Sequence, residues 1–341
     1  MLVRKDGHTI FERCYGLRDF HTRRKIDPIT CFRLASCTKQ FTAMATMLLI
    51  RDHALTYDTR LTEVFPAFPT YGKSITIRNL LNHTSGLPDY EGSTPSPLPN
   101  TPLGQRPQFN DADVLALLEL ATAKFRPGTK WAYSNSGYVL LGEVISKITH
   151  EPFPQFLHNR VFSPLGMNST VAYVKGRNKV PNRAYGHSRR GSGWIETDQS
   201  VTSATLGDGG IYSSLDDLVK WDDALAHNTL LSEEEMQPAL TPTDIPNSGP
   251  VGPDGEPAAY GFGWFLNPYN GHPRMWHHGE TIGFRTSIQR FTSDRLTVIV
   301  LSNRSDLKPI VLGEHIADCF FKKAQARPNR RTKLTDLFLA S

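Results

Sequence analysis

The sequence predicts an α+β fold, with one antiparallel sheet built from both chain ends and a mainly helical part inserted between them. Strand-like patterns fill residues 1–34 and return at residues 285–302, whereas helical patterns dominate from residue 35 to 162. The simplest fold with this order of elements places the strands from both ends of the chain in one sheet. We expect a sheet domain at 1–50 and 205–341, a mainly helical domain at 51–204, and an active site in the cleft between them.

The first elements follow from turn chemistry and periodicity. The segment MLVRKDGHTIFERCYG predicts a hairpin, with strands at Leu2–Arg4 and Thr9–Tyr15 on either side of an Asp6-Gly7 turn. The segment ASCTKQFTAMATMLLI, residues 35–50, has apolar residues at helical spacing and predicts a long helix. The chain therefore enters a helix directly after its first strands.

The middle of the chain alternates between helices and loops. Helices are predicted at Asp113–Ala123, behind a possible cap at Asp111, and at Gly137–Ile148. The stretch Pro88–Pro107 is rich in proline, so we expect a loop at the rim of a site. Residues 163–210 have weak periodicity and predict no regular element.

The C-terminal part predicts the remaining strands. The expected elements are a helix at Leu215–Ala226, strands at Tyr260–Leu266, Arg285–Phe291 and Leu296–Ser302, and a last helix at Pro309–Ala324. A second loop rich in proline and glycine, Thr241–Pro257, precedes these strands. We expect it to shape specificity together with Pro88–Pro107.

Composition narrows the class of protein. The 341 residues include 38 basic and 33 acidic ones, a net charge of +5, and 39% are hydrophobic, which disfavours a disordered chain. No apolar run approaches the roughly 20 residues of a membrane helix. Part of the basic excess lies in KKAQARPNRRTK, residues 322–333, which we interpret as a solvated tail. We expect no nucleic-acid partner; a nucleic-acid binder remains a distant alternative that rests on this tail.

The sequence also lacks several motifs that would indicate a cell compartment or a cofactor. The N-terminus has no apolar core of a secretory signal, and the sequence leaves the compartment open: cytoplasmic as the chain stands, or periplasmic or secreted if the N-terminus was trimmed. The chain has no P-loop, dinucleotide fingerprint, HExxH or CxxC motif, so we expect neither cofactor nor metal. The adjacent His277 and His278 lack a third ligand at suitable spacing and leave metal binding a minor alternative.

A candidate nucleophile comes from a Ser-x-x-Lys pattern, since the hydrolase elbow GxSxG is absent. The copy at Ser305–Lys308 precedes Pro309, which disfavours helix there, so we regard it as chance. The copy at Ser36–Lys39 opens the long helix, where positions three apart share a face. A lysine with a lowered pKa could remove the serine proton, although a capped helix with a surface lysine would look the same.

Two further segments carry residues that suit acyl transfer. Tyr133 and Asn135 precede a helix start; a phenol can shuttle protons and an amide can hold a carbonyl. The segment Trp276–Phe284 precedes the last strands, and a strand edge there would offer backbone N–H donors. Taken alone, each segment is equally compatible with a packed tyrosine at a helix cap or with a glycine-rich hairpin.

Five segments taken together resemble the serine β-lactamase and penicillin-binding-protein superfamily. They are FRLASCTKQFTA, LLNHTSGLPDY, FRPGTKWAYSNSGYVLLG, GDGGIYSSLDDLVKW and WHHGETIGF, in this order over nearly the whole chain. The closer similarity is to the class C β-lactamase-like branch, which includes family VIII carboxylesterases, DD-peptidases and D-amino-acid amidases. The resemblance implies the same α+β fold with an inserted helical domain.

The resemblance also implies roles for individual residues. Ser36 would be the acyl-forming nucleophile, Lys39 its base or proton relay, and Tyr133 a proton shuttle to the leaving group. Asn135 would hold the lysine and a substrate carbonyl. The backbone N–H groups of Ser36 and Glu280 would form the oxyanion hole.

The third motif departs from the superfamily pattern. The position of the Lys-Thr-Gly motif is occupied here by His277, His278 and Gly279, with His277 in the place of the lysine. Together with Glu280, these residues are expected to bind substrate. A histidine is only partly charged near neutral pH, which disfavours an efficient β-lactamase. Glu280 would repel anions and favour an amine if its side chain pointed into the cleft; a solvent-facing Glu280 is about equally expected.

The sequence therefore predicts a serine hydrolase that forms an acyl-enzyme on small esters or amides. We rank an esterase first, followed by a D-amino-acid peptidase or a weak β-lactamase. A non-catalytic scaffold or binding protein of the same fold is the alternative. We assign His83 and Asp208 to turns and Tyr90 to the core, and the sequence leaves the substrate and the oligomeric state open.

Overall fold

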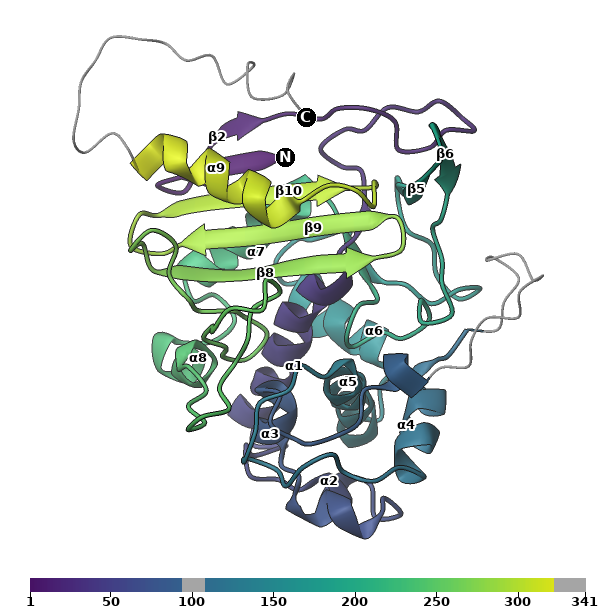
Figure 1. The fold of residues 1–341 in the computed structure, drawn as a ribbon, viewed down its shortest axis with the longest axis vertical. Helices are drawn as coiled ribbons and strands as arrows, with labels where there is room; N and C mark the ends of the chain where they lie inside the picture. The colour runs from purple at the N-terminus through teal and green to yellow at the C-terminus, as the bar shows by residue number, and fades with distance from the viewer. Residues whose placement is uncertain (94–107, 322–341) are drawn as a thin grey trace.

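A computed structural model describes residues 1–93 and 108–321. Its main feature is a five-stranded antiparallel sheet in the order β2-β1-β10-β9-β8 (Figure 1). The strands are β1 (Leu2–Lys5), β2 (His8–Glu12), β8 (Arg274–Thr281), β9 (Phe284–Phe291) and β10 (Leu296–Ser302). Strand β1 pairs with β10, so the two chain ends meet in one sheet and the predicted α+β fold is confirmed.

The N-terminal hairpin forms where its turn residues predict it. Asp6 and Gly7 have φ angles of 53° and 81°, the left-handed values that a two-residue hairpin turn requires. The register shifts between Val3 and Arg4, where one extra residue on β2 bends the ribbon. The hairpin extends the sheet beyond β10.

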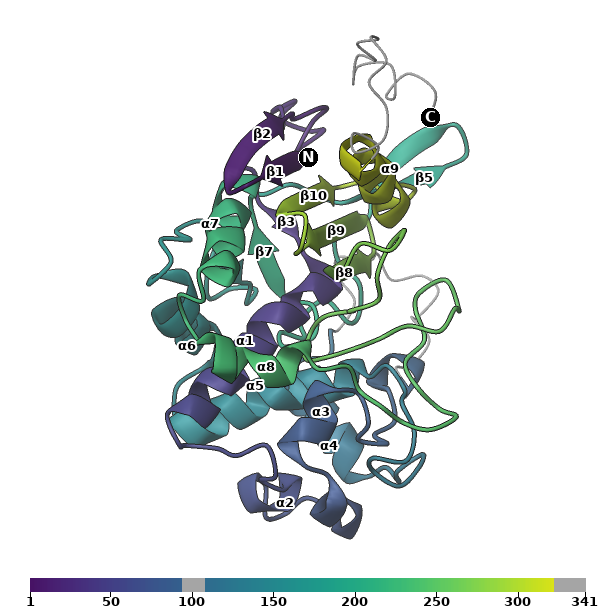
Figure 2. The same ribbon diagram turned by 90° about the vertical axis from the view of Figure 1, so that its left-hand side faces the viewer.

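Helices cover both faces of this sheet (Figures 1 and 2). Helix α9 (Pro309–Phe321) packs on β9 and β10 from one side, and α7 (Leu215–Ala226) lies on the other. The predicted long helix consists of a 3₁₀ turn, η1 (Ala35–Thr38), and α1 (Lys39–Arg51). Every residue of α1 from Lys39 to Leu49 is buried, because α1 runs through the centre of the molecule.

The remaining elements are shorter helices, 3₁₀ or π turns and short strands. The helical ones are α2 (Leu61–Val64), η2 (Thr70–Ser74), α3 (Ile77–Leu81), η3 (Tyr90–Ser93), α4 (Asp111–Glu119), α5 (Asn135–Thr149), α6 (Phe153–Leu157), η5 (His158–Phe162) and α8 (Glu233–Leu240). Helix α5 packs against α1, α3, α4 and α6. The short strands are β3 (Phe32–Arg33), β4 (Val171–Ala172), β5 (His187–Arg190), β6 (Gly193–Glu196) and β7 (Ile211–Ser213).

Two of the predicted elements were wrong in detail. Helix α4 is capped by Asn110 and not by Asp111: Asn110 Oδ1 accepts from Asp113 N–H at 3.1 Å, and the Asp113 carboxylate accepts from Asn110 N–H at 3.0 Å. Asp111 lies inside the helix, where its buried carboxylate accepts from Leu206 N–H. Residues 260–266 form isolated bridges instead of a strand, because Gly261 and Gly263 pass against the backbone of Ala239 and Lys39.

Strands β4, β5 and β6 lie in the segment for which no regular element was predicted. They are two to four residues long, too short for an alternating pattern to stand out. The division into domains at residues 50 and 204 stays a prediction.

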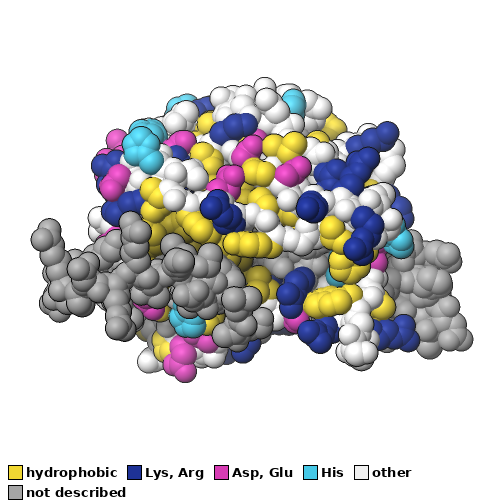
Figure 3. Space-filling model, turned by 90° about the horizontal axis from the view of Figure 1, so that it is seen from above, with side chains coloured by type: hydrophobic (Ala, Val, Ile, Leu, Met, Phe, Trp, Pro, Cys, Tyr) yellow, Lys and Arg dark blue, Asp and Glu magenta, His cyan; other side chains and the backbone are white. Residues whose placement is uncertain are grey.

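The described surface mixes charged and apolar side chains. Seen from above the sheet, Lys and Arg side chains lie among acidic and hydrophobic ones (Figure 3). No helix among the described residues is long and apolar enough to cross a membrane. The basic segment 322–333, on which the nucleic-acid alternative rests, lies outside the described residues.

One ion-pair cluster ties the N-terminal hairpin and the sheet to α7. Asp222 pairs with Arg4 at 2.6 Å and Arg290 at 2.7 Å, and accepts from the Thr297 hydroxyl at 2.8 Å. Its side chain is 9% exposed, whereas that of Asp223, which also pairs with Arg4, is 42% exposed. We expect Asp222→Ala to lower the free energy of unfolding by about 3–5 kcal/mol, because it removes the carboxylate that pairs with Arg290 and leaves the buried Arg4 paired with Asp223 alone.

The matched control is Asp223→Ala, whose exposed pair should contribute no more than about 1 kcal/mol. Urea unfolding of both variants measures the difference. Equal losses of stability in the two variants would contradict the expectation that the buried Asp222 pairs contribute more to the free energy of unfolding than the exposed Asp223 pair.

Candidate active site

Ser36 lies in a tight turn between strand β3 and the central helix α1. Strand β3 belongs to a three-stranded sheet in the order β3-β7-β4. Strand β3 ends at Arg33, and Leu34 N–H donates to Ile211 O at 2.8 Å, which fixes the chain just before the turn. Ala35 then adopts a φ of +47°, a left-handed value that is costly for a residue other than glycine. This strained residue turns the chain into η1, so that Ser36 and Lys39 come within hydrogen-bond distance of each other.

Lys39 is fully buried and touches three segments at once. Its Nζ lies 3.2 Å from Ser36 Oγ, 2.8 Å from Asn135 Oδ1 and 3.0 Å from Asp208 O. Burial lowers the pKa of Lys39, and the nearby carboxylate of Asp208 only partly offsets this. Because the oxygens of Asn135 and Asp208 can only accept, a neutral Lys39 donates to both and keeps its lone pair for the Ser36 proton.

Tyr133 supplies a phenol beside this pair. Its hydroxyl is buried, and Lys39 Nζ lies 4.8 Å from the centre of its ring. Burial raises the pKa of Tyr133 well above its ordinary value of 10, while the Ser36 side chain lowers it in part. Tyr133 is therefore a protonated phenol that can pass a proton between Ser36 and a leaving group.

His83 and Asp89 hold the segment that carries Tyr133 and Asn135. His83 accepts twice, from Ala132 N–H through its carbonyl oxygen at 3.0 Å and from Ser134 N–H through Nδ1 at 3.1 Å. Asn135 N–H donates to Asp89 Oδ2 at 2.7 Å. His83 has a φ of 62°, so it does form the turn assigned to it, and it also fixes the backbone on both sides of Tyr133.

The third motif lies on β8, the edge strand of the large sheet. Trp276 exchanges both backbone hydrogen bonds with Phe265, on the side away from β9. In an antiparallel strand this direction alternates, so the N–H groups of His278 and Glu280 also point outward from the edge. A Cβ on Gly279 would stand 2.0 Å from Leu34 O, so only glycine lets β8 lie this close to the turn that holds Ser36.

His277 is neutral in the place where the superfamily pattern has a lysine. It is buried, its Nδ1 lies 2.6 Å from His278 O, and its Nε2 lies 3.3 Å from Tyr260 Oη. Burial, together with His278 and Lys39, lowers the pKa of His277 well below 6.5. Burial also lowers the pKa of His278 to about 4. Neither imidazole therefore offers a positive charge at neutral pH.

Glu280 directs its carboxylate toward Arg285, with which it pairs at 2.6 Å. Its side chain is 62% exposed, which agrees with the solvent-facing alternative of the two that the sequence left open. The charge of Glu280 is thus largely balanced by Arg285 and shared with water.

A pocket of about 380 Å³ opens in front of Ser36. It is lined by Arg33, Ala35, Ser36, Tyr90, Glu91, Asn135, Thr202, Thr205, Asp208, Gly209, Glu280 and Thr281. Ser36, Asn135 and Glu280 were predicted from the sequence as site residues, whereas the contribution of residues 202–209 was not. Asp208, which was assigned to a turn, and Tyr90, which was assigned to the core, both line the pocket.

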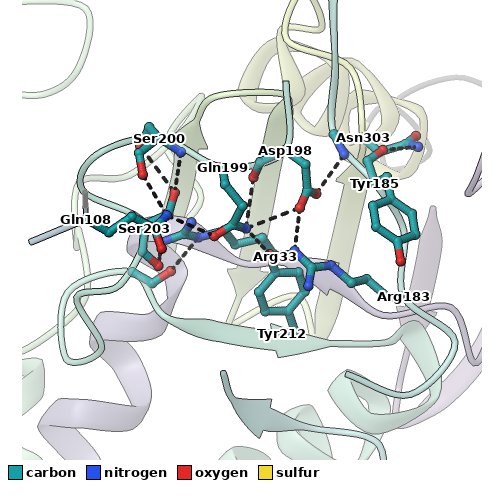
Figure 4. A network of polar contacts seen from close by, with 12 residues as sticks. Arg33, Gln108, Arg183, Tyr185, Asp198, Gln199, Ser200, Ser203, Tyr212 and Asn303 are labelled. Carbon is teal, nitrogen blue, oxygen red and sulfur yellow. Dashed lines mark hydrogen bonds and ion pairs between the residues drawn. The ribbon is translucent and has the colours of Figure 1, made fainter. Parts of the chain in front are cut away.

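The wall at residues 202–209 is held by a polar network (Figure 4). Arg33 donates from Nε to Gly209 O at 3.1 Å and from Nη2 to Ser203 O at 3.2 Å. Gln199 donates to Tyr212 Oη at 3.1 Å and to the Asp198 carboxylate at 3.2 Å, and Asp198 also pairs with Arg183. No sequence motif marks this network, because its members lie far apart along the chain.

The described residues contain no group of three or more His, Cys, Asp and Glu side chains that could hold a metal ion.

The contact between Gly279 and Leu34 gives a prediction about stability. Gly279→Ala forces a Cβ into Leu34 O, and overpacking of this kind costs about 1–3 kcal/mol or more. In the exposed hairpin strand β6, a Cβ on Gly193 would meet nothing closer than 3.9 Å, so Gly193→Ala is the control. We expect a lower urea midpoint for Gly279→Ala only; equal midpoints would contradict the close approach of β8.

The neutral histidines predict a pH dependence of stability. Since the pKa of His277 is lowered in the folded chain, the unfolded chain binds its proton first as pH falls below 6.5. Stability from this group is complete above pH 6.5 and is lost toward pH 5, by up to about 1.4 kcal/mol per pH unit. His277→Gln should flatten the dependence of unfolding free energy on pH by that amount, whereas the exposed His8→Gln should leave it unchanged. If His277→Gln leaves the dependence of unfolding free energy on pH unaltered, the lowered pKa of His277 in the folded chain is contradicted.

The chain is similar to known proteins over most of its length. A family model described as Beta-lactamase matches residues 1–317. The chain is 31% identical over 319 residues to penicillin-binding protein 4* of Bacillus subtilis, covering 90% of this chain and 68% of that protein. It is 29% identical over 307 residues to a D-aminopeptidase of Cereibacter sphaeroides, covering 88% of this chain and 55% of the relative, so it spans about half of that protein's length.

A solved structure shows the same fold. The penicillin-binding protein of Bacillus halodurans superimposes with a TM-score of 0.77 at 25% sequence identity, and the match covers 94% of both chains. The match over residues 1–317 and this shared fold show that the chain belongs to the beta-lactamase family, within the superfamily of serine β-lactamases and penicillin-binding proteins that its motifs resemble.

Proposed function

We propose that this member of a hydrolase family cleaves small amides and esters through an acyl-enzyme on Ser36. The observation that supports this most directly is the buried Lys39 Nζ, 3.2 Å from Ser36 Oγ and held by Asn135 and Asp208. A serine hydroxyl is a weak nucleophile until a base takes its proton, and a lysine with a lowered pKa is such a base.

In the acylation step, Lys39 takes the proton of Ser36 while Oγ forms a bond to the carbonyl carbon of the substrate. The carbonyl oxygen becomes an oxyanion, which the N–H groups of Ser36 and Glu280 would stabilise from the turn and the strand edge. When the intermediate collapses, the bond to the leaving group breaks. The leaving group receives a proton from Lys39 through the Tyr133 hydroxyl.

In the deacylation step, water attacks the ester carbon of the acyl-Ser36 intermediate and transfers one proton to the same Tyr133–Lys39 pair. The second oxyanion collapses, Ser36 Oγ leaves and takes up a proton, and the acid is released. Asn135 keeps Lys39 in place during both steps and can donate from its amide nitrogen to a substrate carbonyl.

The neutral His277 bears on the choice of substrate. A β-lactam or a peptide with a free C-terminus presents a carboxylate, and His277 offers no positive charge to receive it. Uncharged leaving groups suit this edge of the site better. We therefore favour simple esters and amides, with D-aminoacyl compounds included because a D-aminopeptidase is among the relatives, and rank β-lactams last.

The chain provides its own control for this proposal, because the Ser-x-x-Lys pattern occurs twice. We expect a fluorophosphonate to label the wild type on one serine, Ser36→Ala to abolish labelling and ester hydrolysis, and Ser305→Ala to behave as wild type. Tyr133→Phe should keep the labelling site but lower turnover about 10²–10⁴-fold. Intact-mass measurement and p-nitrophenyl ester assays give the readouts.

Hydrolysis that persists in Ser36→Ala would refute the acyl-enzyme. A wild type that is neither labelled nor active would favour the non-catalytic alternative.

A further inference from the structure

Tyr260 is a fully buried tyrosine that the mechanism above does not use. Its exposure is 0%, and its hydroxyl oxygen lies 3.3 Å from Nε2 of His277. The rings around it include those of His83 and Tyr133, whose centres lie 4.7 Å and 6.5 Å from its own. Tyr260 therefore lies between strand β8 and the segments that hold the Tyr133 phenol.

The neighbours of the His277 ring determine where its proton lies. A carbonyl oxygen can only accept, so Nδ1, which lies 2.6 Å from His278 O, carries the hydrogen. A neutral imidazole has one N–H, which leaves a lone pair on Nε2 for the Tyr260 hydroxyl. Tyr138 is a second hydrogen-bond neighbour of Tyr260, but the Tyr138 hydroxyl donates to Leu81 O at 2.7 Å. The Tyr260 hydroxyl therefore has its proton available for His277.

His277 and Tyr260 belong to a set of rings that surrounds the side chain of Tyr133. The ring centre of Tyr133 lies 4.5 Å from that of His83 and 6.2 Å from that of His277. On another side, Lys39 Nζ lies 4.8 Å from the same ring centre. Because protein interiors are closely packed, a side chain enclosed in this way cannot shift unless its neighbours also move. The place of the Tyr133 hydroxyl thus depends on His277 and Tyr260.

The segment that carries Tyr260 is held against both the central helix and β8. A Cβ on Gly263, whose φ is 76°, would stand 2.7 Å from Lys39 O, so this segment lies directly on the backbone of the lysine. Phe265 exchanges both backbone hydrogen bonds with Trp276, at 2.8 and 2.9 Å. Residues 260–265 therefore connect the first turn of α1 with β8, and this connection fixes the place of the Tyr260 ring.

We propose that Tyr260 is a positioning residue for the proton transfer by Tyr133. Its hydroxyl donates to Nε2 of His277 and holds the imidazole in one orientation and one tautomer, and the two rings together keep the Tyr133 phenol in place. Both nitrogens of His277 are then used within the protein. This inference rests on the proposed acyl-enzyme function and adds a residue to it.

The kinetic test is a double-mutant cycle between Tyr260 and Tyr133. Tyr260→Phe keeps the ring and removes only the hydroxyl. A misplacement of 1 Å can cost 10²-fold in rate, so we expect kcat for p-nitrophenyl acetate to fall about 10–100-fold and KM to change less than about threefold. In the Tyr133→Phe background the same substitution should lower kcat by less than about twofold, because no hydroxyl is left to position.

The matched control is Tyr71→Phe. Tyr71 also donates one hydrogen bond from a partly buried hydroxyl, to the carbonyl oxygen of Leu118, but it lies outside the lining of the Ser36 pocket. We expect this variant to keep the wild-type kcat and KM. Three kinetic results would overturn the inference: an unchanged kcat in Tyr260→Phe, the same loss in both Tyr133 backgrounds, or an equal loss in Tyr71→Phe.

A second measurement does not depend on turnover. In the ¹⁵N-histidine-labelled wild type at neutral pH, we expect Nδ1 of His277 to have the NMR chemical shift of a protonated nitrogen and Nε2 that of a nitrogen whose lone pair accepts a hydrogen bond. Loss of the signals in His277→Gln assigns them. Tyr260→Phe should move the Nε2 signal to the higher shift of a free lone pair.

The two measurements together separate this inference from the proposed function. A wild type that fluorophosphonate labels at Ser36 but whose His277 carries its proton on Nε2 contradicts the role of Tyr260 while the acyl-enzyme stands. A wild type without labelling at Ser36 contradicts the proposed function itself.

Discussion

The site depends on one interaction, the placement of a lysine amine inside the protein with three oxygen atoms around it. Lys39 Nζ contacts Ser36, Asn135 and Asp208, which come from three separate segments. Burial disfavours the charged form of a lysine and lowers the pKa of Lys39, while the carboxylate of Asp208 offsets part of this effect. Residues 39–49 of α1 are buried, so the amine of Lys39 is kept from water and lies 3.2 Å from the Ser36 hydroxyl.

The backbone around that amine is fixed by a strained residue and by close contacts between main-chain segments. Ala35 adopts a left-handed φ, and Gly279 allows the edge of the large sheet to touch Leu34. His83 clamps the backbone on both sides of Tyr133 from another loop. Ser36, the Tyr133 phenol and the strand edge are thus positioned mainly through main-chain contacts, which vary little with side-chain motion and suit the oxyanion chemistry of the proposed function.

The charge pattern of the site differs from one end to the other. At the strand edge, His277 and His278 are neutral because burial makes protonation costly. Asp208 and Glu91 carry carboxyl groups in the lining of the pocket in front of Ser36. Under the proposed function, a substrate without a carboxylate beside His277 fits this edge of the site. Fold membership does not determine this preference, since the same fold is shared by proteins named for different substrates.

By itself the sequence determined the hairpin at Asp6-Gly7, the strands that end the chain, the helix after Ser36 and the three motifs that point to acyl transfer. These features are local, because turn residues, alternation and short spacings act within a few residues. The tertiary structure decided three properties of the site: the neutrality of His277, the pairing of Glu280 with Arg285, and the position of Asp208 in the pocket lining as well as in a turn. Burial and the approach of distant segments set these properties, and neither is encoded in the residues that immediately flank each position.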